Sequence, residues 1–256
     1  MKKYIVLLIA SFLFTTSFSQ EKKEAFKSSE WLRYKMSYSG WLRAGTAILE
    51  IEETAYEGKK VFHAKGSGWT SGPIKWFYKV DDVYESYFDK DTIRPYLFKR
   101  KTDEVGYKKN RITSFNYASK NAYVQDFTKQ TDTTVAFVNV QDMMSSFYYL
   151  RNQKVDHLKI GDAIAIDMFL DSQVYPFKLQ FLGREVLSTK FGKIKSLIFR
   201  PLVQSGRIFK AEESVTLWIT DDENKIPIKM KASLSVGSLR AELESYKGLA
   251  NPFNKI

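Results

Sequence analysis

Carboxylates are the side chains of this chain that could do acid-base chemistry, and two adjacent pairs stand out, Asp81-Asp82 and Asp221-Asp222. A glycosidase-type hydrolase needs two carboxyl groups from separate elements that converge about 5 to 10 Å apart. Because neighbouring residues of a strand point to opposite faces, one member of each pair, or Glu185, could contribute to such a site. The segment Asp221-Asp222-Glu223-Asn224 also has the composition of a turn, so this pair could form a turn and have no catalytic role.

Other catalytic chemistries lack the residues that they need. His63 and His157 lie far apart and without acidic residues at metal-binding spacing. The chain contains no cysteine, which excludes thiol nucleophiles, Cys-based zinc sites and disulfides. It has no Gly-x-Ser-x-Gly elbow and no phosphate-binding loop, because Gly66-Ser67-Gly68 lacks a following Gly-Lys-Ser/Thr. The sequence therefore predicts no cofactor and no metal, and favours a noncatalytic protein over an enzyme.

Aromatic side chains give a better functional lead, because many of them crowd into residues 69–88. Such clusters can stack on sugars or line an apolar cavity, and they can equally fill a core. A second group, Phe147-Tyr148-Tyr149 with Arg151, could present polar tips to a ligand if its element faces a cavity. The candidate ligand-binding residues are therefore Trp69, Trp76, Tyr78, Asp81, Asp82, Tyr148, Tyr149 and Arg151.

Period-two alternation of apolar and polar residues predicts the elements that position these side chains. It is clear in residues 32–38, 46–52, 177–181, 226–234 and 239–244. Turn residues such as Ser39-Gly40, Glu57-Gly58 and Phe191-Gly192 separate the segments at short intervals. The pattern predicts a mainly β fold, an antiparallel meander that forms a flattened barrel or a strongly curved sheet.

One segment departs from the alternation and predicts a central helix over residues 141–152. Met143, Phe147 and Leu150 stand at helical spacing behind Asp142, which can serve as the N-cap. No linker rich in Pro, Gly and Ser is present, so we expect residues 20–256 to form one β-rich domain, with two lobes around this helix. Two separately folding domains remain the alternative.

The N-terminus predicts export. Lys2 and Lys3 precede the apolar run Tyr4 to Phe14, and small residues at 17 and 19 suit cleavage after Ser19. The run is about half the roughly 20 residues of a membrane-spanning helix, so we expect a signal peptide over residues 1–19, with a retained anchor as the alternative. Without a cysteine the mature chain is not a lipoprotein. We expect it in the periplasm or at the cell surface, with no transmembrane anchor after cleavage.

The chain is basic, with a formal charge of +11 that falls to +9 when Lys2 and Lys3 leave with the signal. For an exported protein the nearest polyanions are lipopolysaccharide, other lipid head groups and acidic glycans, and not nucleic acid. The densest basic groups, Lys99-Arg100-Lys101 and Lys108-Lys109-Asn110-Arg111, fit either an anion-binding face or a solvated strand edge.

The order of several short segments resembles the bacterial family known as domain of unknown function 3108 (DUF3108). The segments are residues 32–38 with 44–47, 80–86, 140–151, 217–222 with 226–228, and 236–238 with 241–243. The resemblance covers most of the mature chain. It implies an exported, β-rich, barrel-like protein of the cell envelope, with no settled biochemical activity and no agreed catalytic residues.

The sequence thus favours a noncatalytic envelope protein that binds a lipid or a glycan. A carboxylate-dependent hydrolase is the second hypothesis. A scaffold for an envelope assembly is the third, and it predicts a large exposed apolar patch. Neither the identity of the ligand nor the oligomeric state follows from the residues.

Overall fold

A computed structural model describes residues 24–203, 215–234 and 236–256, and the predicted signal peptide therefore lies outside the described residues. These residues form fourteen strands and two helices, whose bounds are β1 Glu30–Tyr38, β2 Leu42–Tyr56, β3 Lys59–Thr70, α1 Ile74–Phe77, β4 Val80–Asp89, β5 Pro95–Glu104, β6 Tyr107–Asn116, β7 Asn121–Asp126, β8 Thr131–Ala136, α2 Met143–Arg151, β9 Ala163–Leu170, β10 Gln173–Thr189, β11 Gly192–Val203, β12 Val215–Thr220, β13 Pro227–Ser233 and β14 Ser238–Lys247.

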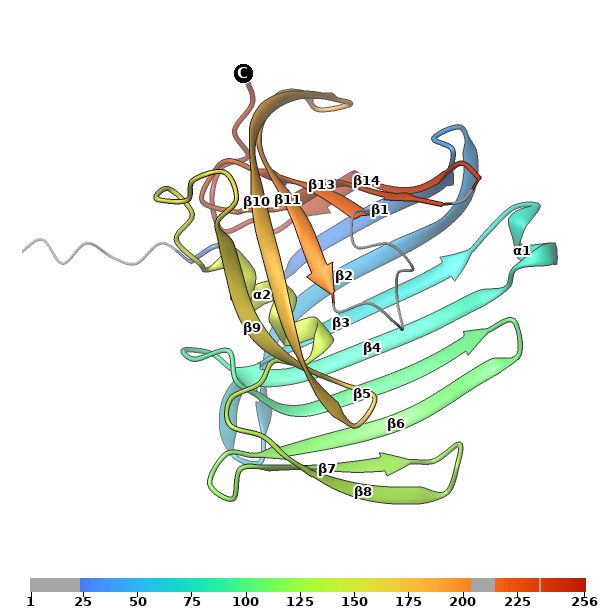
Figure 1. Cartoon of the computed structure of the whole chain (residues 1–256), viewed down its shortest axis with the longest axis vertical. Helices are drawn as coiled ribbons and strands as arrows, with labels where there is room; N and C mark the ends of the chain where they lie inside the picture. The colour runs from blue at the N-terminus through green and yellow to red at the C-terminus, as the bar shows by residue number, and fades with distance from the viewer. Residues whose placement is uncertain (1–23, 204–214, 235) are drawn as a thin grey trace, which may run out of the picture.

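All fourteen strands belong to one antiparallel sheet, in the order β8-β7-β6-β5-β4-β3-β2-β1-β14-β13-β12-β11-β10-β9. Strands that follow one another in sequence are neighbours, except β8 and β9, and the pairing of β1 with β14 joins the two halves of the chain. The sheet curls strongly but does not close, because β8 and β9 are its two edges (Figure 1). The mainly β, strongly curved meander that the sequence predicts is confirmed, as an open sheet.

The connection between β8 and α2 covers the β9 edge. Gln141 forms a parallel bridge with Met168, in which its amide donates to the Asp167 carbonyl at 2.9 Å and its carbonyl accepts from the Phe169 amide at 2.8 Å. An exposed strand edge would leave these backbone groups free to pair with another chain. The short segment therefore provides hydrogen-bond partners for some of the backbone groups of β9 that the open sheet leaves unpaired.

Alternation along the strands decides which face is covered. In β1 the side chains of Leu32 and Tyr34 are buried, while those of Arg33 and Lys35, which alternate with them, are partly exposed. Tyr34 pairs in register with Ala47 of β2 and Leu243 of β14, so one apolar row crosses the junction between the two halves. The concave face of the sheet thereby becomes the core.

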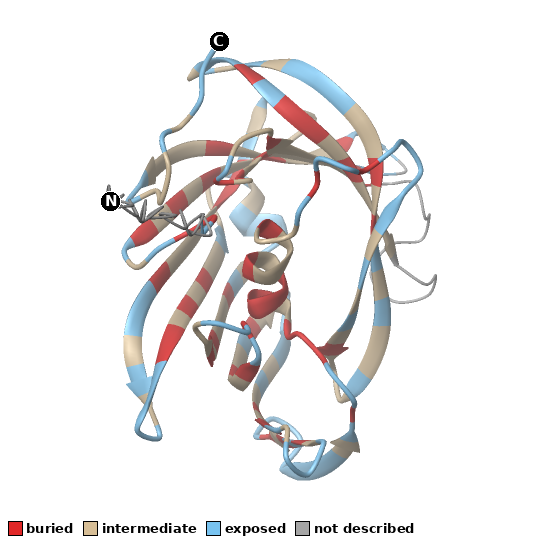
Figure 2. Cartoon of the chain, turned by 90° about the vertical axis from the view of Figure 1, so that its left-hand side faces the viewer, coloured by how far each residue is buried: buried red, intermediate tan, exposed pale blue. Residues whose placement is uncertain are grey.

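Helix α2 lies inside the curled sheet (Figure 2). It begins behind Asp142, whose carboxylate accepts from the backbone amides of Met144 and Ser145 at 2.7 and 2.8 Å, while Ser145 Oγ accepts from the Asp142 amide. This capping box satisfies amides that the first turn leaves unpaired. The predicted central helix and its N-cap are therefore present at this position.

Aromatic packing fixes the helix against the sheet. The ring of Tyr148 lies 4.7 Å from that of Phe26 and 5.6 Å from that of Phe88. Met144 is also buried and belongs to the same cluster. Burying such rings contributes roughly 1.5 to 3 kcal/mol each, so the helix is held mainly by apolar contact with β3, β4 and the N-terminal segment.

Candidate functional site

The predicted aromatic residues lie at one end of the sheet. Trp69 is the penultimate residue of β3, Trp76 belongs to the short helix α1, and Tyr78 directly follows that helix. Their side chains are 38%, 85% and 53% exposed, and α1 contains no buried residue. Asp81 is exposed as well and pairs in register with Trp69. These four candidates are therefore gathered on the solvent side of the β3–β4 connection.

Asp82 faces the other way, into the curl of the sheet. Its carboxylate accepts from the Asp103 amide at 3.2 Å and from the Tyr84 hydroxyl at 3.3 Å. Burial and the neighbouring Glu104 carboxylate together raise the pKa of Asp82 to about 6, against these hydrogen bonds. Asp82 therefore takes up a proton near pH 6, well above the pH at which an ordinary aspartate does so.

Asp82 and Glu104 differ from the pair that the hydrolase hypothesis requires. Asp82 lies near the start of β4, whereas Asp221 and Asp222 occupy the β12–β13 turn at the opposite end of the sheet. Asp222 accepts from the amides of Asn224 and Lys225, and Asp221 pairs with Arg184 at 3.3 Å. Glu185 accepts a hydrogen bond from Trp218 Nε1. The residues of the second aspartate pair thus organise a turn and do not meet the first pair.

The helical candidates separate into two groups. Tyr148 and Arg151 are only 1% and 3% exposed. Arg151 donates to Glu30 and to the carbonyls of Ala25 and Asn224, so its side chain belongs to the core. Tyr149 instead borders a cavity of about 260 Å³ between α2 and the β9–β10 hairpin. Contact of a ligand with Tyr148 or Arg151 would require the helix to move.

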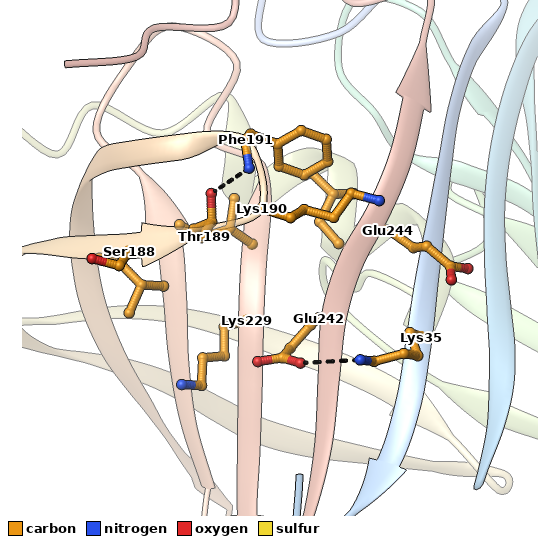
Figure 3. Close-up of a pocket in the computed structure, with 11 residues that line it drawn as sticks. Lys35, Ser188, Thr189, Lys190, Phe191, Lys229, Glu242 and Glu244 are labelled. Carbon is orange, nitrogen blue, oxygen red and sulfur yellow. Dashed lines mark hydrogen bonds and ion pairs between the residues drawn. The ribbon is translucent and has the colours of Figure 1, made fainter. Parts of the chain in front are cut away.

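A different pocket, which no sequence motif indicated, lies between the end of β10 and strands β1, β13 and β14 (Figure 3). Its volume is about 350 Å³, at the lower end of the range for ligand sites. Leu187, Phe191, Ile228 and Leu243 form its apolar wall, which is the edge of a core cluster. No local pattern of residues could indicate this pocket, because Leu187 and Leu243 meet only through the curl of the sheet.

Lysines dominate the polar part of the pocket. Lys35, Lys190 and Lys229 line it together with Glu242 and Glu244. Figure 3 shows Glu242 between Lys35 and Lys229, and the distance from Lys35 Nζ to its carboxylate is 4.0 Å. Glu244 is already paired with Arg33 at 2.9 Å and Arg43 at 3.2 Å, which holds its pKa below the usual range despite the opposing effect of burial. Glu242 is thus the main counter-charge to three lysines.

A larger cavity of about 730 Å³ lies on β4 to β7 near the β2–β3 and β4–β5 turns. Its lining is rich in tyrosines and polar groups. Lys59 Nζ lies 4.5 Å from the centre of the Tyr96 ring, and the Arg94 guanidinium lies 5.2 Å from that of Tyr117. Tyr123, whose side chain is 39% exposed, also lines this cavity. The arrangement can offer both stacking and hydrogen bonds.

Arg100, Lys109 and Arg111 of the basic segments converge on one carboxylate. They donate to Asp171 Oδ1, in the β9–β10 turn, at 2.9, 2.6 and 3.1 Å. These cations hold the pKa of Asp171 below its ordinary value, although burial opposes them. The contact fastens the β9–β10 hairpin to β5 and β6 across the curl. Because Asp171 lies 60 or more positions away in the sequence, spacing alone could not reveal this ion cluster.

The described residues contain no group of three His, Asp or Glu side chains placed to hold a metal ion. Within the same ranges no helix has the length and apolar character to cross a membrane.

Comparison with known sequences decides the family, because the profile of DUF3108, described as a protein of unknown function, matches residues 33–244. The chain belongs to the DUF3108 family. A search of curated proteins finds no similar sequence.

Solved structures resemble the fold of this DUF3108 protein at low sequence identity. A β-barrel-like protein of domain of unknown function DUF1849 from Brucella abortus matches with a TM-score of 0.55 and 11% identity, over 86% of this chain and 97% of that one. A candidate lipoprotein from Parabacteroides distasonis matches with a TM-score of 0.34 and 8% identity, over 89% of this chain and 100% of that one. The similarity to the Brucella protein supports the barrel-like fold, whereas the similarity to the second structure is too low to support a fold assignment.

Proposed function

We propose that this DUF3108 protein is an exported, noncatalytic envelope protein that binds a lipid with an anionic head group. The observation that carries the proposal is the pocket of Figure 3, where an apolar wall and three lysines border the same space. An amphiphile needs both surfaces at once, because its chain avoids water and its phosphate or carboxylate requires positive charge.

The charge balance of the pocket supports an anionic ligand. Glu244 is neutralised by its two arginines, and Lys190 and Lys229 have no carboxylate partner within ion-pair distance among the described residues. A phosphate between Lys35, Lys190 and Lys229 would compete with Glu242 for ion pairs with these lysines. Binding would still be favourable, because three lysines exceed the single charge of Glu242. A neutral sugar would gain nothing from them.

The cellular address of the proposal comes from the N-terminal sequence, where Lys2, Lys3 and the apolar run that follows have the composition of a secretory signal. Lipid and lipopolysaccharide head groups are abundant anions in the compartments to which such a signal leads. Export and the basic character of the chain are therefore consistent with the ligand class that the pocket favours.

Glycan binding is the second candidate, and the tyrosine-lined cavity of about 730 Å³ favours it. Tyrosine offers a flat apolar face and a hydroxyl, which together match a sugar ring. The two candidates use different cavities, so variants can separate them.

Titration with a short-chain phosphatidylglycerol below its micellar concentration tests the proposal. We expect saturable binding, at least about tenfold stronger than for the corresponding phosphatidylcholine, and a loss of about tenfold or more in Lys190→Glu/Lys229→Glu. Lys60→Glu, in the exposed β2–β3 region, is a charge-reversal control outside the pocket, and each single variant, Lys190→Glu and Lys229→Glu, has the same net charge as this control. Equal binding of both lipids, or an unaffected double variant, contradicts the lipid proposal. Binding of oligosaccharides that Tyr123→Ala abolishes would support the glycan candidate.

A further inference from the structure

The connections at one end of the sheet carry exposed apolar side chains. We call this end the turn rim and define it by Trp41 between β1 and β2, Trp76 and Phe77 on α1, Tyr107 at the start of β6, Phe127 between β7 and β8, and Val236 between β13 and β14. Trp41, Trp76, Phe77 and Val236 are 78%, 85%, 80% and 76% exposed. Figure 1 shows these connections together along the right-hand side.

The opposite ends of the same strands have a different composition. The β2–β3 turn contains Glu57-Gly58, the β4–β5 turn contains Lys90-Asp91-Thr92, and the β12–β13 turn contains Asp221-Asp222-Glu223. Among the described residues, none of these three turns carries an exposed large hydrophobic side chain, and at this end the connection after β8 carries a single one, Val138. Single exposed apolar residues are common on any surface, but their concentration at one end of a sheet marks an interaction site.

The fold itself does not explain these side chains. Helix α1 contributes no buried residue, so Trp76 and Phe77 add little to the core. The segment that precedes the helix lies against β2, where the Ser71 amide donates to the Ala44 carbonyl at 2.9 Å. The helix itself projects beyond the sheet (Figure 1). A large aromatic side chain that is held away from the core is arranged to meet something outside the molecule.

Positive charges accompany the aromatic residues. Lys75 precedes Trp76 on α1, Lys108 follows Tyr107, and Lys129 lies in the same turn as Phe127, and all three lysines are exposed. Lys75 and Lys129 have no ion pair among the described residues, and Lys108 is 3.9 Å from Asp103. Tryptophan and tyrosine favour the interface of a bilayer, and lysines beside them are attracted to anionic head groups.

We propose that the turn rim docks the protein on the surface of an anionic phospholipid bilayer, with Trp41, Trp76 and Phe77 entering the interfacial layer. The surface of an anionic bilayer is flat and negatively charged, with apolar acyl chains beneath its head groups, and it therefore matches connections that project from several adjacent hairpins with lysines between them. Docking through the turn rim goes beyond the proposed function, because it does not depend on a ligand in the pocket.

Vesicle cosedimentation of the purified protein tests the docking. We expect binding to vesicles of phosphatidylglycerol and phosphatidylethanolamine that weakens with salt, and little binding to phosphatidylcholine vesicles. Trp76→Ser/Phe77→Ser should reduce the affinity by about tenfold or more, because these side chains lose their apolar transfer into the interface. The pocket variant Lys190→Glu/Lys229→Glu separates the two proposals, since its vesicle binding should persist when its binding of monomeric lipid is lost.

Ile160→Ser is the matched control, because Ile160 is 76% exposed but lies outside the turn rim. Unchanged denaturant unfolding of Trp76→Ser/Phe77→Ser verifies that the fold is intact. Equal vesicle binding by this variant and the wild type, or no binding to anionic vesicles, overturns the inference. A concentration-dependent dimer that disappears in the same variant would overturn it as well, since the rim would then be covered by a second copy.

Discussion

Arg151 donates to both carboxylate oxygens of Glu30, at 2.6 and 2.8 Å, although the two side chains are only 3% and 2% exposed. This bidentate pair joins the last turn of α2 to the first residue of β1, which lies 121 positions earlier in the chain. Arg151 Nε donates to the Asn224 carbonyl, and Nη2, which also binds Glu30, donates to the Ala25 carbonyl. One arginine thus connects the helix, the N-terminal segment and the β12–β13 turn.

We predict that Arg151→Met lowers the free energy of unfolding by about 3 to 5 kcal/mol, because the Glu30 carboxylate would remain buried without a partner. Urea unfolding followed by circular dichroism measures the effect. Arg33→Ala removes a half-exposed pair with Glu244 and should cost about 1 kcal/mol or less. Similar losses for the two variants would contradict the structural role of Arg151.

We expect the buried carboxyl group of Asp142 to make the free energy of unfolding depend on pH. Burial raises its pKa from 3.8 to about 6, against the hydrogen bonds from Ser86 and the first turn of α2. The folded state therefore binds a proton at a higher pH than the unfolded state does. Its contribution to stability grows as the pH falls through 6 and levels off below 3.8.

Asp142→Asn keeps an N-cap acceptor and removes the titration. We expect the difference in unfolding free energy, wild type minus variant, to rise by about 2 to 2.5 kcal/mol between pH 7.5 and pH 4. Urea unfolding at several pH values measures it. A difference that falls over the same range would mean that the cap stabilises the carboxylate more than burial penalises it.

Asp171→Ala should loosen the β9–β10 hairpin, because Arg100, Lys109 and Arg111 would lose their common acceptor. We expect a loss of about 1 to 3 kcal/mol and faster amide exchange in residues 163–180. Hydrogen exchange followed by mass spectrometry measures the local effect. Unchanged exchange in the hairpin, with normal exchange in α2 as the reference, would show that apolar contacts alone hold it.

Two glycines of the β2–β3 pair give a matched test of packing. A Cβ at Gly45 would lie 2.3 Å from the Trp69 carbonyl oxygen, whereas a Cβ at Gly68 would meet nothing within 4 Å. Gly45→Ala should therefore cost about 1 to 3 kcal/mol, and Gly68→Ala should be neutral or stabilising by about 0.5 kcal/mol. Thermal unfolding compares them, and equal melting temperatures would contradict the close approach of the two strands at Gly45.

The strands and the central helix could be predicted because they depend on local patterns. Alternation places Leu32 and Tyr34 on one face, and Asp142 caps a helix whose apolar residues recur at helical spacing. The open edges at β8 and β9 could not be predicted in this way, since closure depends on the curl of the whole sheet.

For the candidate site, too, features that depend on local composition could be predicted and features that depend on long-range contacts could not. Sequence composition indicated the aromatic region around Trp76, but it could not show that Arg151 is satisfied by Glu30 in the core. The pairing of Asp82 with Glu104 depends on the register between β4 and β5, and the pocket depends on β10 crossing β1 and β14. Contacts between distant segments carry no signal in a single sequence. The domain organisation and the signal peptide stay predictions.

The central claim is that the pocket of Lys35, Lys190 and Lys229 holds an anionic lipid, and native mass spectrometry of protein purified from the envelope of its own host tests it most directly. We predict a near-stoichiometric lipid adduct with a phosphate or carboxylate head group, which is absent from Lys190→Glu/Lys229→Glu and present in Lys60→Glu. Ligand-free wild-type protein, or an adduct that the double variant retains in full, would contradict the claim.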